Sequence, residues 1–321
     1  MRDKHTHDMQ GHDMHGRGNQ RSERGAALVA AVALLAIFSM LGVAYLRSMS
    51  IEEDRVRWEN RGLRAETLAD DYLRIAIQDL NAMIANGDAV PGELTFPTVP
   101  VYVNGRDGAE SLVDTESLRG EIRIRIRDEA SKLDLNRASA ALIGAVTGLD
   151  EAAATRIREN TRSPFRPDAG GNLPLSTLDE LKTRGLLDEA AFDALPREHI
   201  TVFSGPGPLL NANAMPEAML ASVLGVDADT AAALAAARPF ASREALEAQL
   251  GDDATLPAAV GVSSNCYRLL CEVVMTQPTA GQAWQPARTQ RLEAVVAFGG
   301  DGPRVLHWQR APVPDNEEST S

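Results

Sequence analysis

From Gly25 to Leu46 the chain reads GAALVAAVALLAIFSMLGVAYL, and no side chain in this stretch carries a charge. A helix of about 20 apolar residues, rising about 1.5 Å per residue, is long enough to cross the hydrocarbon core of a bilayer. The stretch therefore predicts one membrane-spanning helix. A helix buried in the core of a soluble protein is the alternative at this length.

The charges that flank this stretch predict its orientation. Upstream lie the basic residues Arg2, Lys4, Arg17, Arg21 and Arg24, whereas the single Arg47 downstream is followed by Glu52, Glu53 and Asp54. Basic flanks stay on the cytoplasmic side of a membrane, so we expect a cytoplasmic amino terminus and an exported main domain. A cleaved secretory signal would have a shorter apolar core and a small-x-small site, for which residues 39–45 are a poor match.

The helical pattern continues beyond the membrane. Apolar residues recur at helical spacing from Ile51 to Ile84, until Asn86, Gly87 and Pro91 interrupt them. We therefore predict one helix of roughly 60 residues, on the order of 90 Å long, that runs from the membrane into the outer compartment.

Alternating apolar residues predict β-strands on both sides of a central helical region. Within Glu121 to Arg127 the isoleucines share one face, and Arg123, Arg125 and Arg127 form the solvated face. Three more strands are expected at 267–275, 291–298 and 304–309, with a turn at 299–303. The two cysteines, Cys266 and Cys271, then point to opposite faces of one strand, so we expect no disulfide between them.

The helical region between these strands contains an internal repeat. Residues 136–150, NRASAALIGAVTGLD, align with residues 213–227, NAMPEAMLASVLGVD. In each copy we expect the initial asparagine, Asn136 or Asn213, to cap a short helix. A glycine, an apolar residue and an aspartate then lead into a second helix, and the turn residues are Gly148 and Asp150 in one copy and Gly225 and Asp227 in the other.

The remaining parts of the two copies also correspond. The second helices are expected at Glu151 to Glu159 and at Ala228 to Ala237. Phe165 or Phe240 follows, and then a third amphipathic stretch that carries Leu178 and Leu181 or Leu246 and Leu250. The pattern is that of a duplicated helix-hairpin-helix unit.

Helix-hairpin-helix units often bind a nucleic-acid backbone, because the two glycines of Gly-x-Gly let backbone amides approach a phosphate. Here Asp150 and Asp227 replace the second glycine. A carboxylate at that place repels a phosphate and, as a helix cap, occupies the same amides. The net charge of −13 is also a poor match to a polyanion. We therefore expect no nucleic-acid partner.

Signatures of catalysis or of a resident cofactor are not found. The chain has no Gly-x-Ser-x-Gly, no His-Glu-x-x-His and no P-loop, so we expect no enzyme. The acidic residues Asp179, Glu180, Asp188 and Glu189 lack the spaced loop of a calcium site, and a solvated helix face is the preferred interpretation. His5, His7, His12 and His15 could loosely ligate a metal, but a solvated tail is preferred.

The residues Arg24-Gly25-Ala26-Ala27-Leu28, followed by the long apolar helix, resemble the processing and anchor region of type IV pilin-like proteins, in which a prepilin peptidase cuts between Gly25 and Ala26. Together with DEASKLDLN at 128–136, LNAN at 210–213, RLEAVV at 291–296 and RVLHW at 304–308, the chain is similar to the K-type minor pseudopilin of type II secretion systems, the general secretion pathway protein K family. The resemblance covers nearly the whole chain from Arg24 to Trp308.

Ala30 is the one informative departure from ordinary pilins. It is the fifth residue counted from Ala26, where most pilins carry a glutamate that pairs with the amino group of the preceding subunit and compensates for a charge buried in the membrane. A subunit without a predecessor has no such amino group to neutralise. The resemblance implies that K-type subunits lie at the tip of the filament, and Ala30 agrees with that position.

The resemblance implies an α+β fold, with a type IV pilin-like helix packed on a small antiparallel sheet and an inserted all-α domain of duplicated helix-hairpin-helix (SAM-like) units. The expected parts are a cytoplasmic leader peptide at 1–25, a transmembrane and stalk helix at 26–87, a β part at 88–130 and 260–310, the insert at 131–258, and a polar tail at 311–321.

The same resemblance implies the cellular setting. It implies a single-pass protein of the inner membrane with a periplasmic main domain, which assembles with other minor pseudopilins in a tip complex and acts in protein secretion across the outer membrane. It also implies calcium for some members, although the loop at 166–172 is short for that role. The competing hypothesis is a membrane-tethered DNA receptor of the competence type, which also joins one anchor to helix-hairpin-helix units.

Overall fold

The computed structural model describes residues 17–87, 90, 92–103, 118–161, 173–251, 256–279 and 282–312. They form two compact units, one ending at Asn60 and the other beginning at Arg61. The first unit consists of the amino-terminal part of helix α1, Arg17–Ala85. Its stretch Ala31–Glu53 is apolar and long enough for a single membrane span, and a signal sequence would meet the same criterion.

Helix α1 ends where the sequence predicts but begins earlier than expected. The last helical residue is Ala85, and Gly87 adopts a φ of +77°, a conformation that stops a helix. The helix starts at Arg17, inside the segment that we interpret as a leader, and has 69 residues in place of roughly 60. The extension follows from the local sequence, because no proline stands between Arg17 and Ala85.

The second unit contains a six-stranded antiparallel sheet in the order β1-β3-β8-β9-β10, with β2 also paired to β3. The strands are β1 Glu93–Thr95, β2 Val99–Val103, β3 Leu118–Asp128, β8 Cys266–Thr279, β9 Gln282–Gly299 and β10 Gly302–Arg310. Every predicted strand is present and longer than predicted. The sequence does not predict the short strands β1 and β2, because Pro97 and Pro100 within this segment argue against a strand.

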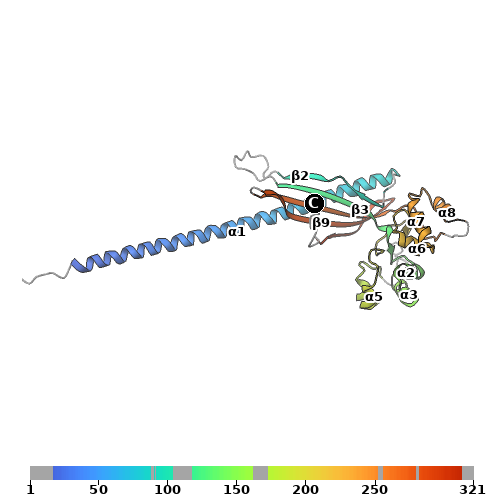
Figure 1. Ribbon diagram of the computed structural model, residues 1–321, viewed down its shortest axis with the longest axis horizontal. Helices are drawn as coiled ribbons and strands as arrows, with labels where there is room; N and C mark the ends of the chain where they lie inside the picture. The colour runs from blue at the N-terminus through green and yellow to red at the C-terminus, as the bar shows by residue number, and fades with distance from the viewer. Residues whose placement is uncertain are drawn as a thin grey trace, which may run out of the picture. The chain divides into compact units, whose positions relative to one another are not determined.

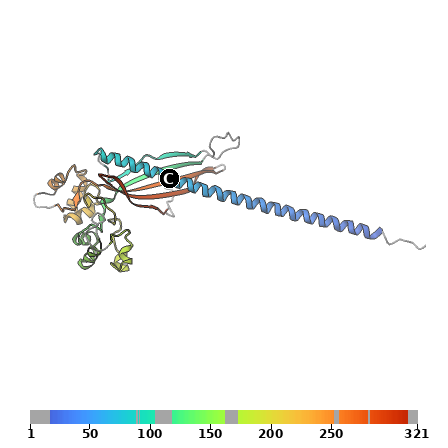
Figure 2. The same cartoon turned by 180° about the vertical axis from the view of Figure 1, so that it is seen from behind.

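One face of this sheet packs against the part of α1 that follows Arg61 (Figure 2). Register places Ile124, Cys271 and Leu292 in one row across β3, β8 and β9. Side chains of such a row point to the same face. The helix contributes a stripe of buried residues at helical spacing, Ala69, Leu73, Ala76 and Leu80. Cys266 lies in a separate cluster with Val295 and Ala297, and both cysteines are free, as predicted.

The remaining chain leaves the sheet after β3 and returns at β8. Because Asp128 and Tyr267 are paired neighbours, exit and return lie side by side, and the insert sits at one end of the sheet (Figure 1). Its elements are η1 Glu129–Ser131, β4 Leu133–Asp134, α2 Ala140–Thr147, α3 Glu151–Asn160, α4 Glu180–Thr183, α5 Glu189–Asp193, β5 Ile200–Thr201, β6 Leu210–Asn211, α6 Glu217–Leu224, α7 Ala228–Ala236, α8 Arg243–Leu250 and β7 Val260–Gly261.

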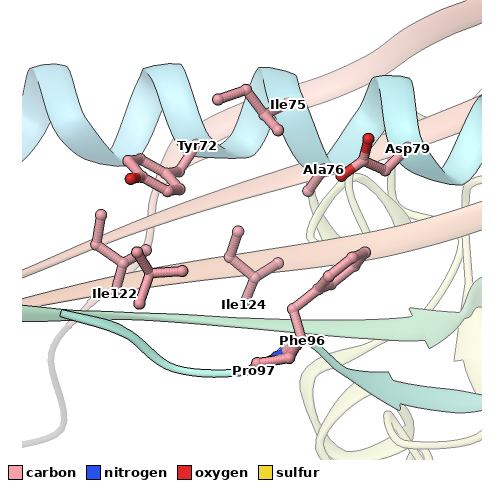
Figure 3. Close-up of a pocket in the computed structure, with 9 residues that line it drawn as sticks. Tyr72, Ile75, Ala76, Asp79, Phe96, Pro97, Ile122 and Ile124 are labelled. Carbon is pink, nitrogen blue, oxygen red and sulfur yellow. The ribbon is translucent and has the colours of Figure 1, made fainter.

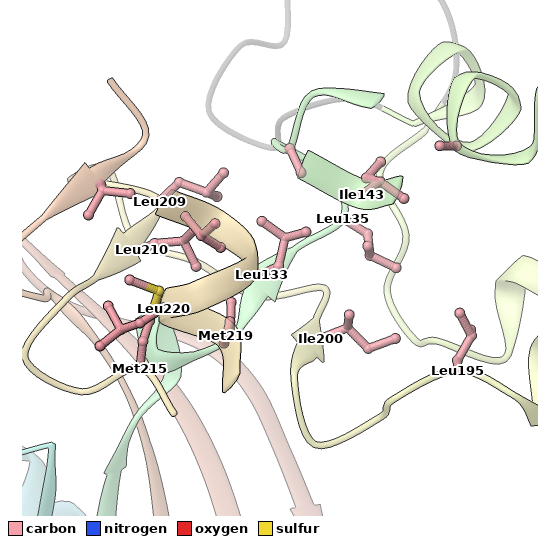
Figure 4. Packing of buried hydrophobic residues seen from close by; sticks show 14 of the residues in the cluster. Leu133, Leu135, Ile143, Leu195, Ile200, Leu209, Leu210, Met215, Met219 and Leu220 are labelled. Carbon is pink, nitrogen blue, oxygen red and sulfur yellow. The ribbon is translucent and has the colours of Figure 1, made fainter. Parts of the chain in front are cut away.

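The insert has a hydrophobic core of its own (Figure 4). Leu133 and Leu210, at equivalent positions of the two repeats, are both fully buried, as are Met215 and Leu220. Phe165, the loop at 166–172, the four leader histidines and residues 313–321 of the tail lie outside the described residues.

Candidate functional site

The two copies of the repeat form the same local turn. Helix α2 is followed by Gly148 at a φ of 73°, and α6 by Gly225 at a φ of 65°. Both glycines are left-handed, a conformation that residues with a side chain rarely adopt. The chain bends by 120° between α6 and α7. Helices α2 and α6 also contact each other, so the two units share one core.

Asp150 and Asp227 cap the helices that follow these turns. The Asp150 carboxylate accepts a hydrogen bond from the Ala153 amide at 2.7 Å, and the Asp227 carboxylate accepts one from the Thr230 amide at 2.7 Å. The hydrogen bond from Thr230 lowers the pKa of Asp227 below its usual value. Each turn thus presents a negative charge that already binds the amide a phosphate would need.

The predicted caps at Asn136 and Asn213 are wrong. The caps are Ser139 for α2, whose side chain accepts from an amide of the helix, and Pro216 for α6, which makes no side-chain cap. The Asn136 side-chain amide instead donates to the carbonyls of Leu175 and Val202, both at 2.9 Å, and its oxygen accepts from the Leu175 amide at 2.7 Å. It therefore joins distant segments of the insert.

Asn213 repeats this arrangement in the second copy. It donates to the carbonyls of Phe240 and Val262 at 3.0 and 2.8 Å and accepts from the Phe240 amide at 2.8 Å. By these contacts the counterpart of Phe240 is Leu175. The sequence comparison paired Phe240 with Phe165, because it assumed loops of similar length in the two copies. The loop that follows the second helix is in fact longer in the first copy.

The repeat begins before the two asparagines. Leu133 pairs in parallel with Ile200, and Leu210 pairs in parallel with Val260, so each copy is closed by a short two-stranded bridge. Asp134 and Asn211 follow at equivalent positions. Each accepts the backbone amide two residues on, at 2.9 and 3.1 Å respectively.

A buried cluster of carboxylates connects the insert to the sheet. Glu129, only 1% exposed, accepts from the Arg268 guanidinium at 2.8 and 2.7 Å and from the Thr201 hydroxyl at 2.5 Å. Arg268 comes from strand β8, whereas Thr201 belongs to the insert. Burial alone would raise the pKa of Glu129, but the hydrogen bonds and charge of Arg268 lower it below its usual value.

Two aspartates complete this junction. Asp128 accepts from the Asn211 side chain at 2.6 Å, and Asp134 accepts from the Ser204 hydroxyl at 2.5 Å. Burial raises the pKa of both carboxyl groups to about 6. Such a network, with partners on both sides, holds the insert at a defined place on the sheet. Sequence reasoning missed it, although acidic residues within DEASKLDLN, between apolar segments, were a usable signal.

An open groove runs between α1 and the β1–β2 side of the sheet (Figure 3). Its volume is about 200 Å³, and its lining is almost entirely apolar. Tyr72, Ile75 and Asp79 of the helix face Phe96 and Pro97 of the segment between the strands. Ile75 is 49% exposed, so the helix side of the groove presents an apolar surface to solvent.

Within the described ranges, no three histidine, cysteine, aspartate or glutamate side chains gather as a metal site would require. Three of the four acidic residues considered for calcium have other contacts. Asp188 caps α5, Glu189 pairs with Lys182 at 2.6 Å, and Glu180 pairs with Arg184. Gly25, Ala26 and Ala30 lie within α1.

No protein-family model matches the chain, and no curated protein matches it. The class is therefore defined by the fold alone: a long amino-terminal apolar helix packed on an antiparallel sheet, which is a pilin-like architecture.

Proposed function

We propose that this chain is a minor pseudopilin, a structural subunit at the tip of a type II secretion pseudopilus. In this proposal it acts in protein secretion across the outer membrane by assembling with other minor pseudopilins, and it performs no catalysis. It is anchored in the inner membrane by α1, with a cytoplasmic amino terminus and a periplasmic main domain. Prepilin peptidase removes the leader between Gly25 and Ala26.

The observation that carries the proposal is the combination of a pilin-like helix and sheet with an insert between β3 and β8. The sheet packs on α1 through the stripe from Ala69 to Leu80, which leaves the preceding apolar part of the helix for the membrane and for neighbouring helices. An ordinary shaft subunit needs no additional domain at the end of its sheet. A subunit with nothing above it has room for one.

Ala30 supports the tip position by a separate argument. In a filament that grows from the membrane, the glutamate at the fifth position pairs with the amino group of the subunit ahead, so that neither charge stays unpaired in hydrocarbon. The first subunit has none ahead of it, and a glutamate there would be an uncompensated charge. An uncharged residue such as alanine avoids that cost.

The processing step tests the proposal. The full chain is isolated from cells with an active prepilin peptidase, and the mass of its amino-terminal peptide is measured. We expect a chain that begins at Ala26, and we expect G25V to block cleavage, while G42V, a matched change farther along the helix, leaves it intact. A wild-type chain that still begins at Met1 would contradict the proposal.

A second candidate function, a membrane-tethered DNA receptor of the competence type, is favoured by the paired helical turns at Gly148 and Gly225. The caps at Asp150 and Asp227 oppose it, because both place a carboxylate on the amides that would bind phosphate. Salt-dependent binding of duplex DNA by the full chain at ~0.15 M salt would reverse our ranking of the two functions.

A further inference from the structure

A row of arginines occupies the face of β3 that points away from α1. Ile122, Ile124 and Ile126 are buried beneath the helix. Arg123, Arg125 and Arg127 alternate with them and therefore belong to the opposite face. Three guanidinium groups on neighbouring positions of one strand repel one another unless each finds a carboxylate.

All guanidinium groups around Arg125 have acidic partners. Arg123 pairs with Glu121 at 2.8 Å, and Arg127 pairs with Glu93 at 3.2 Å. On the next strand, Arg268 pairs with Glu129 at 2.7 Å and also with Glu293. Within this network each positive charge is thus matched.

Arg125 is the exception. It is half-buried, and in the part of the chain that the structure describes it makes no side-chain hydrogen bond and no ion pair. Removing a guanidinium partly from water without a partner costs free energy. The chain carries a net charge of −13, so the lack of a counterion here does not reflect a shortage of acidic residues.

Arg125 also lines a cavity of about 130 Å³ together with Arg127, Arg268, Leu270 and Glu293. The cavity therefore has a cationic wall, one apolar residue and one carboxylate. The fork of a guanidinium can donate two parallel hydrogen bonds to a carboxylate. Leu270 can contact the methylene groups that carry such a carboxylate. Glu293 would repel a phosphate or any other ligand of higher charge.

We propose that Arg125 receives a single aspartate or glutamate side chain from another pilin-like subunit, which docks on the outer face of the sheet. The inference rests on the proposed function, since it names a contact within the assembly. One unmatched positive charge calls for one negative charge. A partner protein that lies over the sheet can deliver one carboxylate into the cavity, whereas a nucleic acid needs many matched cations.

The test compares variants of the full-length, affinity-tagged chain in cells that also express its native neighbours. Subunits retained with the chain after detergent extraction are quantified by mass spectrometry. R125A is expected to reduce retention of one pilin-like subunit by roughly tenfold, as for the loss of one partly buried charge contact. R125K, which keeps the charge but not the fork, is expected to fall between R125A and the wild type.

R304A is the matched control, because it removes an exposed arginine from β10 and is expected to leave retention unchanged. A charge exchange gives the strongest support: R125E abolishes retention, and an aspartate or glutamate to arginine change in the retained subunit restores it. The thermal unfolding midpoint of R125A is expected to be no lower than that of the wild type, because the unpaired guanidinium does not stabilise the free subunit.

Three results would overturn the inference. The first is equal retention by R125A and the wild type. The second is a parallel loss of retention and thermal stability in R125A, which would make Arg125 a structural residue of the sheet. The third is that R125A reduces the retention of a second, differently tagged copy of this chain and leaves the retention of other pilin-like subunits unchanged. If the wild-type chain retains no pilin-like subunit at all, the proposed function fails and this contact fails with it.

Discussion

Replacing Asn136 with alanine removes the side chain that joins three segments of the insert. Asn136 is 1% exposed, and its partners Leu175 and Val202 are 3% and 5% exposed. The variant N136A leaves two carbonyls and one amide without their partner. Because these groups lie away from solvent, water does not readily replace the lost hydrogen bonds.

The size of the effect follows from these three groups. A buried polar group that loses its partner costs about 1 to 3 kcal/mol. Allowing for partial relaxation, we expect N136A to reduce the free energy of unfolding of the insert by about 3 to 5 kcal/mol. A loss of 1 kcal/mol lowers the unfolding midpoint of a domain of this size class by about 2 to 4 °C. The predicted shift is therefore at least about 6 °C.

The assay is thermal unfolding of the full chain in detergent, combined with hydrogen exchange at the Leu175 amide. N213A is the internal control, since Asn213 makes the same three contacts but is only partly buried. We expect a smaller shift for N213A because Asn213 itself is partly exposed, so water can replace part of what its side chain provides. A midpoint for N136A within about 2 °C of the wild type, with unchanged exchange at Leu175, would refute the reasoning.

Three further predictions concern the core, the junction and the turns. In chemical denaturation, L73A should lower the free energy of unfolding by about 2 to 5 kcal/mol, because Leu73 is fully buried. I75A, at a position 49% exposed, should lower it by less than about 1 kcal/mol. Equal effects of the two variants would contradict the packing described. Burial raises the pKa of Asp134 from 3.8 to about 6, so its ionised form opposes folding above that pH. The variant D134N, which places an asparagine as at Asn211, should therefore stabilise the chain by up to about 3 kcal/mol at pH 7.5. Denaturation at several pH values should show this gain shrinking as the pH falls from 6 to 4. A gain that does not depend on pH would show that the charge of Asp134 is not the cause. Fluorescence anisotropy should detect no salt-dependent binding of duplex DNA to the wild-type chain at ~0.15 M salt. If the wild type does bind DNA, and D150A and D227A bind it equally well, the role given to the two caps is refuted.

The elements that could be predicted from sequence are those whose pattern is local. The apolar stripe of α1 and the alternation in β3 each repeat over many residues, so period alone identified them. The turns at Gly148 and Gly225 were also readable, since glycine before an aspartate marks the end of one helix and the start of the next.

What sequence could not provide were the contacts between distant segments. Asn136 stands where a helix cap is common, and only the fold brings Leu175 and Val202 to it, 39 and 66 residues away in the chain. The junction at Glu129 depends in the same way on Arg268, which is 139 residues away. A carboxylate that looks solvated in sequence is buried here because its partner arrives from another strand.

The position of the subunit in a filament is the central claim, and labelling tests it most directly. The full chain carries an epitope in the insert, at residues 162–172 between α3 and α4, and filaments are examined by immunogold electron microscopy. The account predicts gold at one end of each filament, with at most one cluster per filament. Gold spread along the shaft would contradict it.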